Sequence, residues 1–103
     1  MTRGEVWWMR PPGEPSRPAC VLTRDAGIPV LRRITVIPAT TTIRGIATEV
    51  ELDAADGMPR TCALSLDNLR TVDKGVLTER ITRLSPARMD EVCRALAFAT
   101  GCR

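Results

Sequence analysis

An arginine and a group of threonines stand where the sequence predicts two strand ends. Arg17 precedes Pro18 and the apolar run 19–22, which we interpret as a buried strand, because proline fits the first residue of a strand or an edge. A second strand-like run, 34–39, is followed by three threonines at 40–42. Arginine stays charged at ordinary pH, and its planar fork of N–H donors suits phosphate oxygens. A charged fork and a hydroxyl cluster at strand ends therefore predict a site for a phosphodiester.

The chain contains no histidine, and its four cysteines are scattered at positions 20, 62, 93 and 102. The lack of histidine excludes a ribonuclease mechanism in which two histidines act as acid and base. The cysteines form no CxxC pair and do not match the spacing of a zinc site, so we expect no metal and no cofactor. Cys20, Cys62 and Cys93 fall on apolar patterns and are predicted to be small buried hydrophobes.

The length and composition indicate one domain, residues 1–103, with a net charge of +3. Residues 1–44 carry seven Arg and three acids, 45–69 one Arg and five acids, and 70–103 seven Lys or Arg and four acids. Two basic segments around an acidic one are typical of a protein that binds nucleic acid or an acidic partner; a solvated surface in an Arg-rich protein explains them equally well.

The hydrophobic segments of the chain are short. No apolar run approaches the length of a membrane span. Near the N-terminus, Arg10 interrupts the run 7–9, which therefore lacks the apolar core of a signal peptide. We therefore expect a cytoplasmic protein with no membrane partner.

The spacing of apolar residues predicts several short strands followed by one helix. Strands are expected at residues 5–9, 18–23, 31–39, 46–52, 61–66 and 80–84. Ser85 is a candidate N-cap, Pro86 suits the first helical position, and Gly101 is a plausible stop. The apolar face of this helix is predicted to consist of Met89, Val92, Cys93 and Leu96. Short strands closed by one helix favour a small barrel or sandwich.

Several segments, taken in order, point to one known family. They begin with Arg-Gly-Glu-Val-Trp at 3–7 and Arg-Pro-Ala-Cys-Val-Leu at 17–22, followed by Pro-Ala-Thr-Thr at 38–41 and Asp-Asn-Leu-Arg-Thr-Val-Asp-Lys at 67–74. The C-terminal half continues with the apolar positions Leu77, Ile81, Leu84, Met89, Val92 and Leu96. In this order and spacing, nearly the whole chain resembles the MazF/PemK (Kid) toxins of bacterial toxin–antitoxin modules.

The resemblance implies a fold, an activity and partners. The fold is mainly β with α: an SH3-like small barrel of antiparallel strands with a C-terminal helix, working as a homodimer. The activity is sequence-selective cleavage of single-stranded RNA without a metal, which inhibits translation and growth. The implied antitoxin is MazE-like, and its acidic, disordered tail covers the RNA site.

By the resemblance, Arg17 and Thr40 occupy the family's catalytic positions. The reaction is attack of an RNA 2′-OH on the adjacent phosphorus, which leaves a cyclic phosphate and a 5′-OH. It needs a proton acceptor, a proton donor and stabilisation of negative charge. Arg17 supplies the last and Thr40 donates a hydrogen bond to a phosphate oxygen, but Arg17, with a pKa above about 12, is a poor base. A carboxylate, a polarised 2′-OH or Arg17 in an unusual environment must accept the proton.

Each of these two residues also has an explanation that involves no catalysis: a surface salt bridge for Arg17, and the high β-propensity of threonine for Thr40.

Trp7 and Trp8 should lie on alternate faces of a strand, one in the core and one exposed. An exposed ring stacks on a base or packs in a dimer interface. The residues expected to contact RNA are Trp8, Arg10, Arg24, Thr41, Arg44, Asp67, Asn68 and Arg70. For the arginines among them, a solvated surface is the competing explanation.

Two other functions stay open from the sequence. The first is a DNA gyrase poison of the CcdB type, which shares the barrel and has no use for Arg17 and Thr40 together. The second is a non-catalytic RNA-binding or interaction module on the same barrel. Cleavage of naked RNA distinguishes both from the endoribonuclease.

Overall fold

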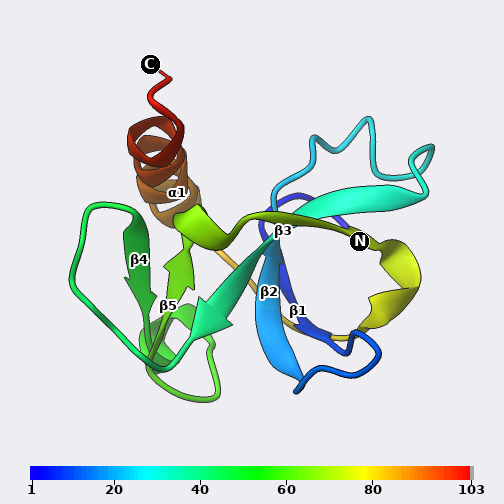
Figure 1. The fold of residues 1–103 in the computed structure, drawn as a ribbon, viewed down its shortest axis with the longest axis horizontal. Helices are drawn as coiled ribbons and strands as arrows, with labels where there is room; N and C mark the ends of the chain where they lie inside the picture. The colour runs from blue at the N-terminus through cyan, green and yellow to red at the C-terminus, as the bar shows by residue number, and fades with distance from the viewer. Residues whose placement is uncertain (103) are drawn as a thin grey trace.

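The computed structural model describes residues 1–102 and shows antiparallel strands with one α-helix beside them (Figure 1). The strands of this described part are β1 (Glu5–Met9), β2 (Arg17–Val21), β3 (Arg33–Thr40), β4 (Glu49–Leu52), β5 (Cys62–Ser65), β6 (Arg70–Asp73) and β7 (Leu77–Arg83). The helices are the short 3-10 turns η1 (Ala54–Asp56), η2 (Leu66–Asn68) and η3 (Lys74–Val76), and α1 (Pro86–Thr100).

The strand β3 holds the two parts of the sheet together because it changes neighbours along its length. On one edge, residues 33–36 pair with β6 and residues 39–40 pair with β5, while the other edge pairs with β2. Along the sheet the order is β4-β5-β3-β2-β1-β7, with β6 paired to β3 outside this path, so within residues 1–102 the sheet is open between β4 and β7. The predicted mainly β fold with a C-terminal helix is confirmed, as a small barrel-like arrangement that is not closed.

Both faces of the central strands are buried, which explains why β2 is apolar throughout its second half. Ala19 and Val21 belong to one hydrophobic cluster, and Cys20 between them belongs to the other. The cluster that contains Cys20 includes residues of β4, β5 and α1, and the other includes residues of β6 and β7. A continuous apolar run is typical of a strand that is covered on both sides.

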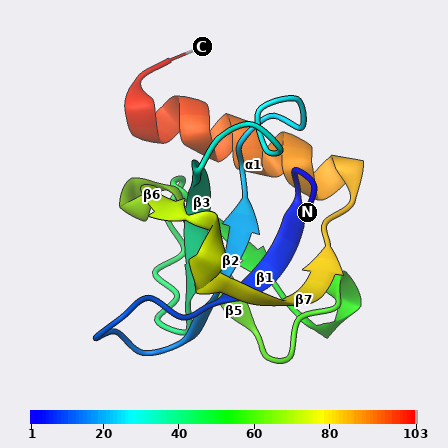
Figure 2. The same cartoon turned by 90° about the vertical axis from the view of Figure 1, so that its right-hand side faces the viewer.

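The helix α1 runs across one end of the sheet (Figure 2) and begins and ends as predicted. The Ser85 Oγ accepts a hydrogen bond from the Arg88 amide at 3.2 Å, and Pro86 fills the first turn. Gly101 follows the helix with φ 72°, a left-handed conformation that glycine adopts without strain. The helix packs on β4 and η2, with Val92 and Ala95 buried.

The cysteine predictions are partly correct. Cys20 and Cys62 are buried, and burial raises the pKa of the Cys20 thiol to about 12. Cys93 is exposed, contrary to the prediction, because it lies at the edge of the apolar stripe, whose inner positions are Val92 and Ala95. Its Sγ accepts a contact of 3.5 Å from Arg3 Nη2.

Several strand boundaries differ from those expected. The strand expected at 31–39 begins only at Arg33, because the amide of Leu31 bonds to the carbonyl of Gly27 and closes a turn. The strand expected at 46–52 begins at Glu49, whose carboxylate accepts hydrogen bonds from loop amides and caps the preceding loop. The strand β6 was not predicted, and β7 begins at Leu77 rather than at residue 80. Pairing with β3 and β1, respectively, extends both strands beyond their local pattern.

The two tryptophans do not divide into one buried and one exposed ring. Both are half-buried, and the pairing of β1 with β7 has register shifts between residues 6 and 7 and between residues 8 and 9, which interrupt a strict alternation of faces. Trp7 packs against the cluster of Met9 and Val21, and its indole N–H donates to Glu5 Oε1 at 3.1 Å. The prediction of one ring in the core and one exposed ring is therefore wrong. Among residues 1–102, no helix is both long and apolar enough to span a bilayer.

Candidate active site

Arg17 and Thr40 lie at neighbouring strand ends, as the first residue of β2 and the last residue of β3. The two strands are antiparallel, and their register pairs Ala19 with Pro38. Carried two residues further, the same register sets Arg17 opposite Thr40. Opposite residues in an antiparallel pair point to the same face of the sheet. The structure therefore brings the two side chains to one place.

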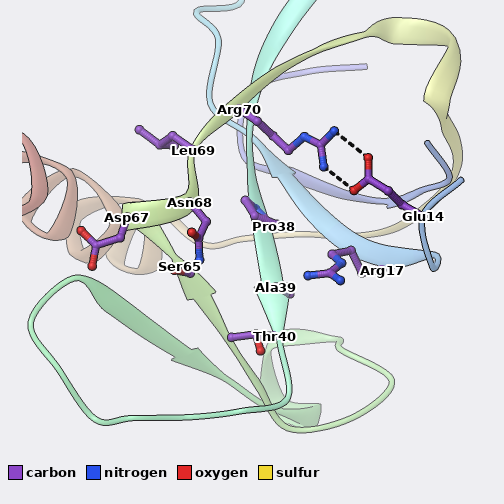
Figure 3. A pocket seen from close by; sticks show the side chains of 10 residues that line it. All are labelled: Glu14, Arg17, Pro38, Ala39, Thr40, Ser65, Asp67, Asn68, Leu69 and Arg70. Atoms are coloured by element: carbon purple, nitrogen blue, oxygen red, sulfur yellow. Dashed lines mark hydrogen bonds and ion pairs between the residues drawn. The ribbon is translucent and has the colours of Figure 1, made fainter. Parts of the chain in front are cut away.

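This place is a polar pocket of about 390 Å³, shown in Figure 3. The loop between β1 and β2, the end of β3 and the segment through η2 to the start of β6 form its walls. The lining residues are Glu14, Arg17, Pro38, Ala39, Thr40, Ser65, Asp67, Asn68, Leu69 and Arg70. Two adjoining hollows also border on Arg17 and Thr40; one adds Thr42, Arg44, Ile46 and Glu49, and the other adds Ser16 and Thr41. The strand ends thus open into a connected groove.

The Arg17 guanidinium is available to an anion from outside. None of the ion pairs between residues 1–102 involves it, although it is close enough to Glu14 for its charge to lower the pKa of that carboxyl. Its side chain is exposed and lines the pocket beside the end of β3, as Figure 3 shows. An exposed, uncommitted guanidinium in a polar pocket is suited to bind a phosphate.

The Thr40 hydroxyl is held in place as an acceptor, which leaves its proton free. Its Oγ1 accepts a hydrogen bond from the Thr42 amide at 3.1 Å. A hydroxyl has one donor and two lone pairs, so this bond does not use the O–H. Thr40 can therefore donate to an oxygen atom of a bound phosphate.

The wall opposite the β1–β2 loop is formed by η2. The Asp67 Oδ2 accepts a hydrogen bond of 2.6 Å from Thr48 Oγ1, and Asn68 Nδ2 donates to Ser65 Oγ at 2.8 Å. A second bond, from the Leu66 amide to the Thr48 carbonyl at 2.9 Å, ties the same two segments together. The bond to Ser65 does not use the amide oxygen of Asn68 or its second N–H, and Asn68 lines the pocket, so both groups can bond to the edge of a base.

An ion pair crosses the pocket from the loop to β6. The Glu14 carboxylate accepts hydrogen bonds from Arg70 Nη1 at 2.7 Å and from Arg70 Nη2 at 3.0 Å (Figure 3). The hydrogen bond from Arg70 holds the pKa of Glu14 below its usual value; desolvation opposes the shift, and the charges of Arg70 and Arg17 add to it. Sequence reasoning missed Glu14, although a carboxylate in a proline-rich loop shortly before Arg17 was a usable signal.

The pocket contains most of the residues expected to contact substrate. Arg17, Thr40, Asp67, Asn68 and Arg70 line it, and Thr41 and Arg44 line the adjoining hollows. Thr42, the third threonine of the predicted hydroxyl cluster, also lines one of these hollows. The other lining residues that sequence reasoning did not name as candidates, apart from Glu14, are Ser16, Pro38, Ala39, Ile46, Glu49, Ser65 and Leu69.

Three predicted RNA contacts do not line the pocket: Trp8, Arg10 and Arg24. Arg24 follows the far end of β2, and a strand of five residues is about 16 Å long. Trp8 is half-buried in β1, and Arg10 starts the loop, with its amide bonded to the Val76 carbonyl at 2.8 Å. No group of three or more His, Cys, Asp or Glu residues able to hold a metal ion occurs within the described residues.

A family model described as a PemK-like, MazF-like toxin of a type II toxin–antitoxin system matches residues 2–99. The chain belongs to this toxin family. Among curated proteins, this MazF-like chain is 48% identical over 101 residues to the probable endoribonuclease MazF5 of Mycobacterium tuberculosis, covering 97% of this chain and 93% of that protein. It is 36% identical over 86 residues to the endoribonuclease EndoA of Bacillus subtilis, covering 81% and 74%.

Solved structures of MazF-like proteins share the fold. The Mycobacterium tuberculosis toxin MazF-mt6 has a TM-score of 0.89 at 31% identity, over 96% of this chain and 98% of that one. A mycobacterial endoribonuclease in complex with its cognate antitoxin has a TM-score of 0.90 at 27% identity, over 100% and 97%. The resemblance to the MazF/PemK family is therefore confirmed along nearly the whole chain.

Proposed function

We propose that this MazF-like chain is an endoribonuclease toxin that cuts single-stranded RNA at selected sequences and so inhibits translation and growth. The relatives named above are endoribonucleases or toxins, which supports the activity. The observation that carries the proposal is the placement of Arg17 opposite Thr40 in one polar pocket, with no intramolecular ion pair for Arg17 among residues 1–102. This arrangement favours catalysis over the alternatives of a gyrase poison or a passive binding module.

The proposed reaction is transfer of the phosphodiester within RNA. The 2′-oxygen forms a bond to phosphorus while the bond from phosphorus to the 5′-oxygen breaks; the 2′-OH gives up its proton and the leaving 5′-oxygen receives one. The products are a cyclic phosphate and a 5′-OH, and DNA is spared because it lacks the 2′-OH. Arg17 stabilises the negative charge that develops on the phosphorane oxygens, and Thr40 donates its O–H to one of them.

The proton acceptor is not assigned to one residue. The pocket holds two carboxylates, but in the free protein Glu14 is bonded to Arg70 and Asp67 to Thr48. Either would have to exchange its partner before it accepted a proton. The other candidates are a polarised 2′-OH and Arg17 itself. Charge stabilisation is consequently the main contribution that we ascribe to this site.

The proposed partners follow from the family and from the site. A solved relative is an endoribonuclease in complex with its cognate antitoxin, and a Deinococcus radiodurans structure contains MazE with MazF. A groove that carries Arg17, Arg44 and Arg70 suits the acidic, disordered tail of a MazE-like antitoxin. We further propose that the protein works as a homodimer in the cytoplasm, where its RNA substrate and antitoxin are made.

The test is cleavage of purified single-stranded RNA by the purified protein. We expect 5′-OH and cyclic-phosphate ends at a small set of sequences, mapped by sequencing the RNA ends. Intact RNA at high protein concentration would contradict the proposal and favour a gyrase poison, which inhibition of DNA supercoiling then detects. Binding without cleavage would favour the passive RNA-binding module.

A further inference from the structure

The three arginines of the groove differ in their partners. In the described chain, the Arg17 and Arg44 side chains form no ion pair, whereas both outer nitrogens of Arg70 are held by Glu14. In Figure 3 the Arg17 side chain lies between this Glu14–Arg70 pair and Thr40. The Arg70 guanidinium thus lies in the same pocket as Arg17 and Thr40, but Glu14 already occupies it.

The Glu14 carboxylate binds Arg70 through the same kind of paired contacts that a phosphate makes. Arginine binds a carboxylate and a phosphate through the same two parallel N–H···O bonds. Distances of 2.7 and 3.0 Å show that Glu14 makes both bonds. The side chains of Arg70 and Glu14 are 37% and 41% exposed, and pairs this exposed are weak and screened by salt. A phosphodiester can therefore replace the Glu14 carboxylate.

The same pair also fastens the β1–β2 loop. Within residues 1–102, the two bonds to Arg70 are the side-chain hydrogen bonds that link residues 11–16 to another element. The loop's own backbone bond, from the Glu14 amide to the Pro11 carbonyl at 3.2 Å, is internal. Breaking the pair thus leaves the loop anchored at Arg10, whose amide bonds to Val76, and at the start of β2.

We propose that the Arg70 guanidinium is a second phosphodiester subsite, next to the one at Arg17 and Thr40, and that Glu14 occupies it in the free protein until RNA displaces it. This inference rests on the proposed ribonuclease function. The second phosphate of the bound strand takes the two N–H groups that Glu14 releases. The β1–β2 loop opens in the same step. At Arg70, the RNA phosphate takes the place of the Glu14 carboxylate, so binding of RNA and release of the loop occur together.

A double-mutant cycle in RNA binding tests the exchange. The probe is a single-stranded RNA of mixed sequence, about ten nucleotides long and methylated at every 2′-oxygen so that it cannot be cleaved. We expect Glu14→Gln to bind it about two- to fivefold more tightly than the wild type, and Arg70→Ala to bind it more weakly. In the Arg70→Ala background, Glu14→Gln should have no further effect. Glu51→Gln, which removes one exposed carboxylate on β4, serves as the charge-matched control and should bind like the wild type.

Several outcomes would overturn the subsite. One such outcome is an unchanged affinity for Glu14→Gln. Another is binding that Glu14→Gln tightens by the same factor with and without Arg70, which is a general charge effect. The salt dependence gives a second readout: Arg70→Ala should lower the slope of log K against log salt by about 0.7, the value for one phosphate on a single strand. An unchanged slope contradicts a phosphate contact at Arg70.

Cleavage of the unmethylated RNA by the wild type is measured in the same series. Cleavage without coupling between Glu14 and Arg70 overturns the subsite and leaves the proposed function standing. Coupling without cleavage by any variant overturns the proposed function and keeps the subsite for binding. A Glu14→Gln variant that binds normally but no longer cleaves makes Glu14 the proton acceptor and overturns its role as a displaced anion.

Discussion

Arg17 and Thr40 occupy opposite positions at the ends of β2 and β3, because the register that pairs Ala19 with Pro38 continues to them. Both side chains are free to bind a phosphate. Arg17 forms no ion pair within residues 1–102, and the Thr40 hydroxyl accepts a hydrogen bond from the Thr42 amide, which leaves its O–H free to donate.

Replacing Arg17 should remove most of the activity. Arg17→Ala is expected to lower the single-turnover cleavage rate by about 10²- to 10³-fold, the usual cost of deleting one group that stabilises developing negative charge. Arg17→Lys should restore only part of the rate, since lysine lacks the planar fork. Arg24→Ala, beyond the far end of β2, is the matched control and should cleave normally. A normal rate for Arg17→Ala would exclude a catalytic role.

The Thr40 hydroxyl should matter separately from the shape of the side chain. Thr40→Val keeps the β-branch and removes the O–H, and we expect it to cleave about 10- to 100-fold more slowly, in line with a lost hydrogen bond to a charged group. Thr40→Ser should retain most of the rate. Thr61→Val, outside the pocket, controls for the change in polarity. Equal rates for Thr40→Val and Thr40→Ser would show that the hydroxyl is not used.

The contact between Asp56 and Arg88 should make stability depend on acid pH. Burial raises the pKa of Asp56, but the Arg88 Nε bond at 2.9 Å, the Asp53 amide and the Arg88 charge outweigh it and hold the pKa below its usual value. A lowered folded-state pKa contributes stability above the unfolded pKa of about 3.9, and this contribution is lost as the pH falls through the folded value.

Asp56→Asn should therefore lower the free energy of unfolding by about 1–2 kcal/mol at pH 7, and by progressively less below pH about 4. Urea denaturation at several pH values measures this difference. Asp90→Asn, exposed and outside the ion pairs of the described chain, should change little at any pH. A difference that stays constant with pH would contradict the assignment.

Gly57 should tolerate no side chain. Its φ is 88°, and an added Cβ would collide with Thr82 Oγ1, which donates to the Asp56 carbonyl at 3.0 Å. We expect Gly57→Ala to cost about 2 kcal/mol or more, from the strained backbone together with the clash. Gly45→Ala has a similar φ of 68° but open space around it, so it should cost less. Thermal unfolding of the two variants separates the clash from the backbone strain.

Cleavage should survive removal of divalent ions. The proposed reaction uses Arg17 and Thr40 for charge stabilisation and needs no Lewis acid. We expect the same cut sites and nearly the same rate in excess EDTA, with a metal-dependent nuclease as the positive control for chelation. Loss of activity that a single added divalent ion restores would show that the mechanism is incomplete.

The parts of the fold that follow from local chemistry were predictable. The sequence places β1 at 5–9, Arg17 at the mouth of β2, Thr40 at the end of β3, and the helix between Ser85 and Gly101, and the structure agrees with each. Proline, a capping serine and a terminal glycine act on their own neighbours, so their effect can be seen without the rest of the chain.

The parts that depend on distant neighbours were not predictable. β6 is a strand because residues 70–73 pair with β3, and Cys93 is exposed because the helix turns Val92 and Ala95 toward the sheet. Both Trp rings are half-buried, and the register shifts that interrupt the alternation of faces on β1 come from its pairing with the distant strand β7. Arg24 has the right charge but follows the wrong end of its strand.

The sequence by itself determined the chemical groups of the candidate site and the strand ends that carry them. Only the tertiary structure decided which of these groups lie next to one another. Its strand register sets Arg17 opposite Thr40, and its fold joins Glu14 to Arg70, which are 56 residues apart in the chain. The reason is physical, since periodicity and capping act over a few residues, whereas strand pairing joins distant segments through their shared burial and backbone hydrogen bonds.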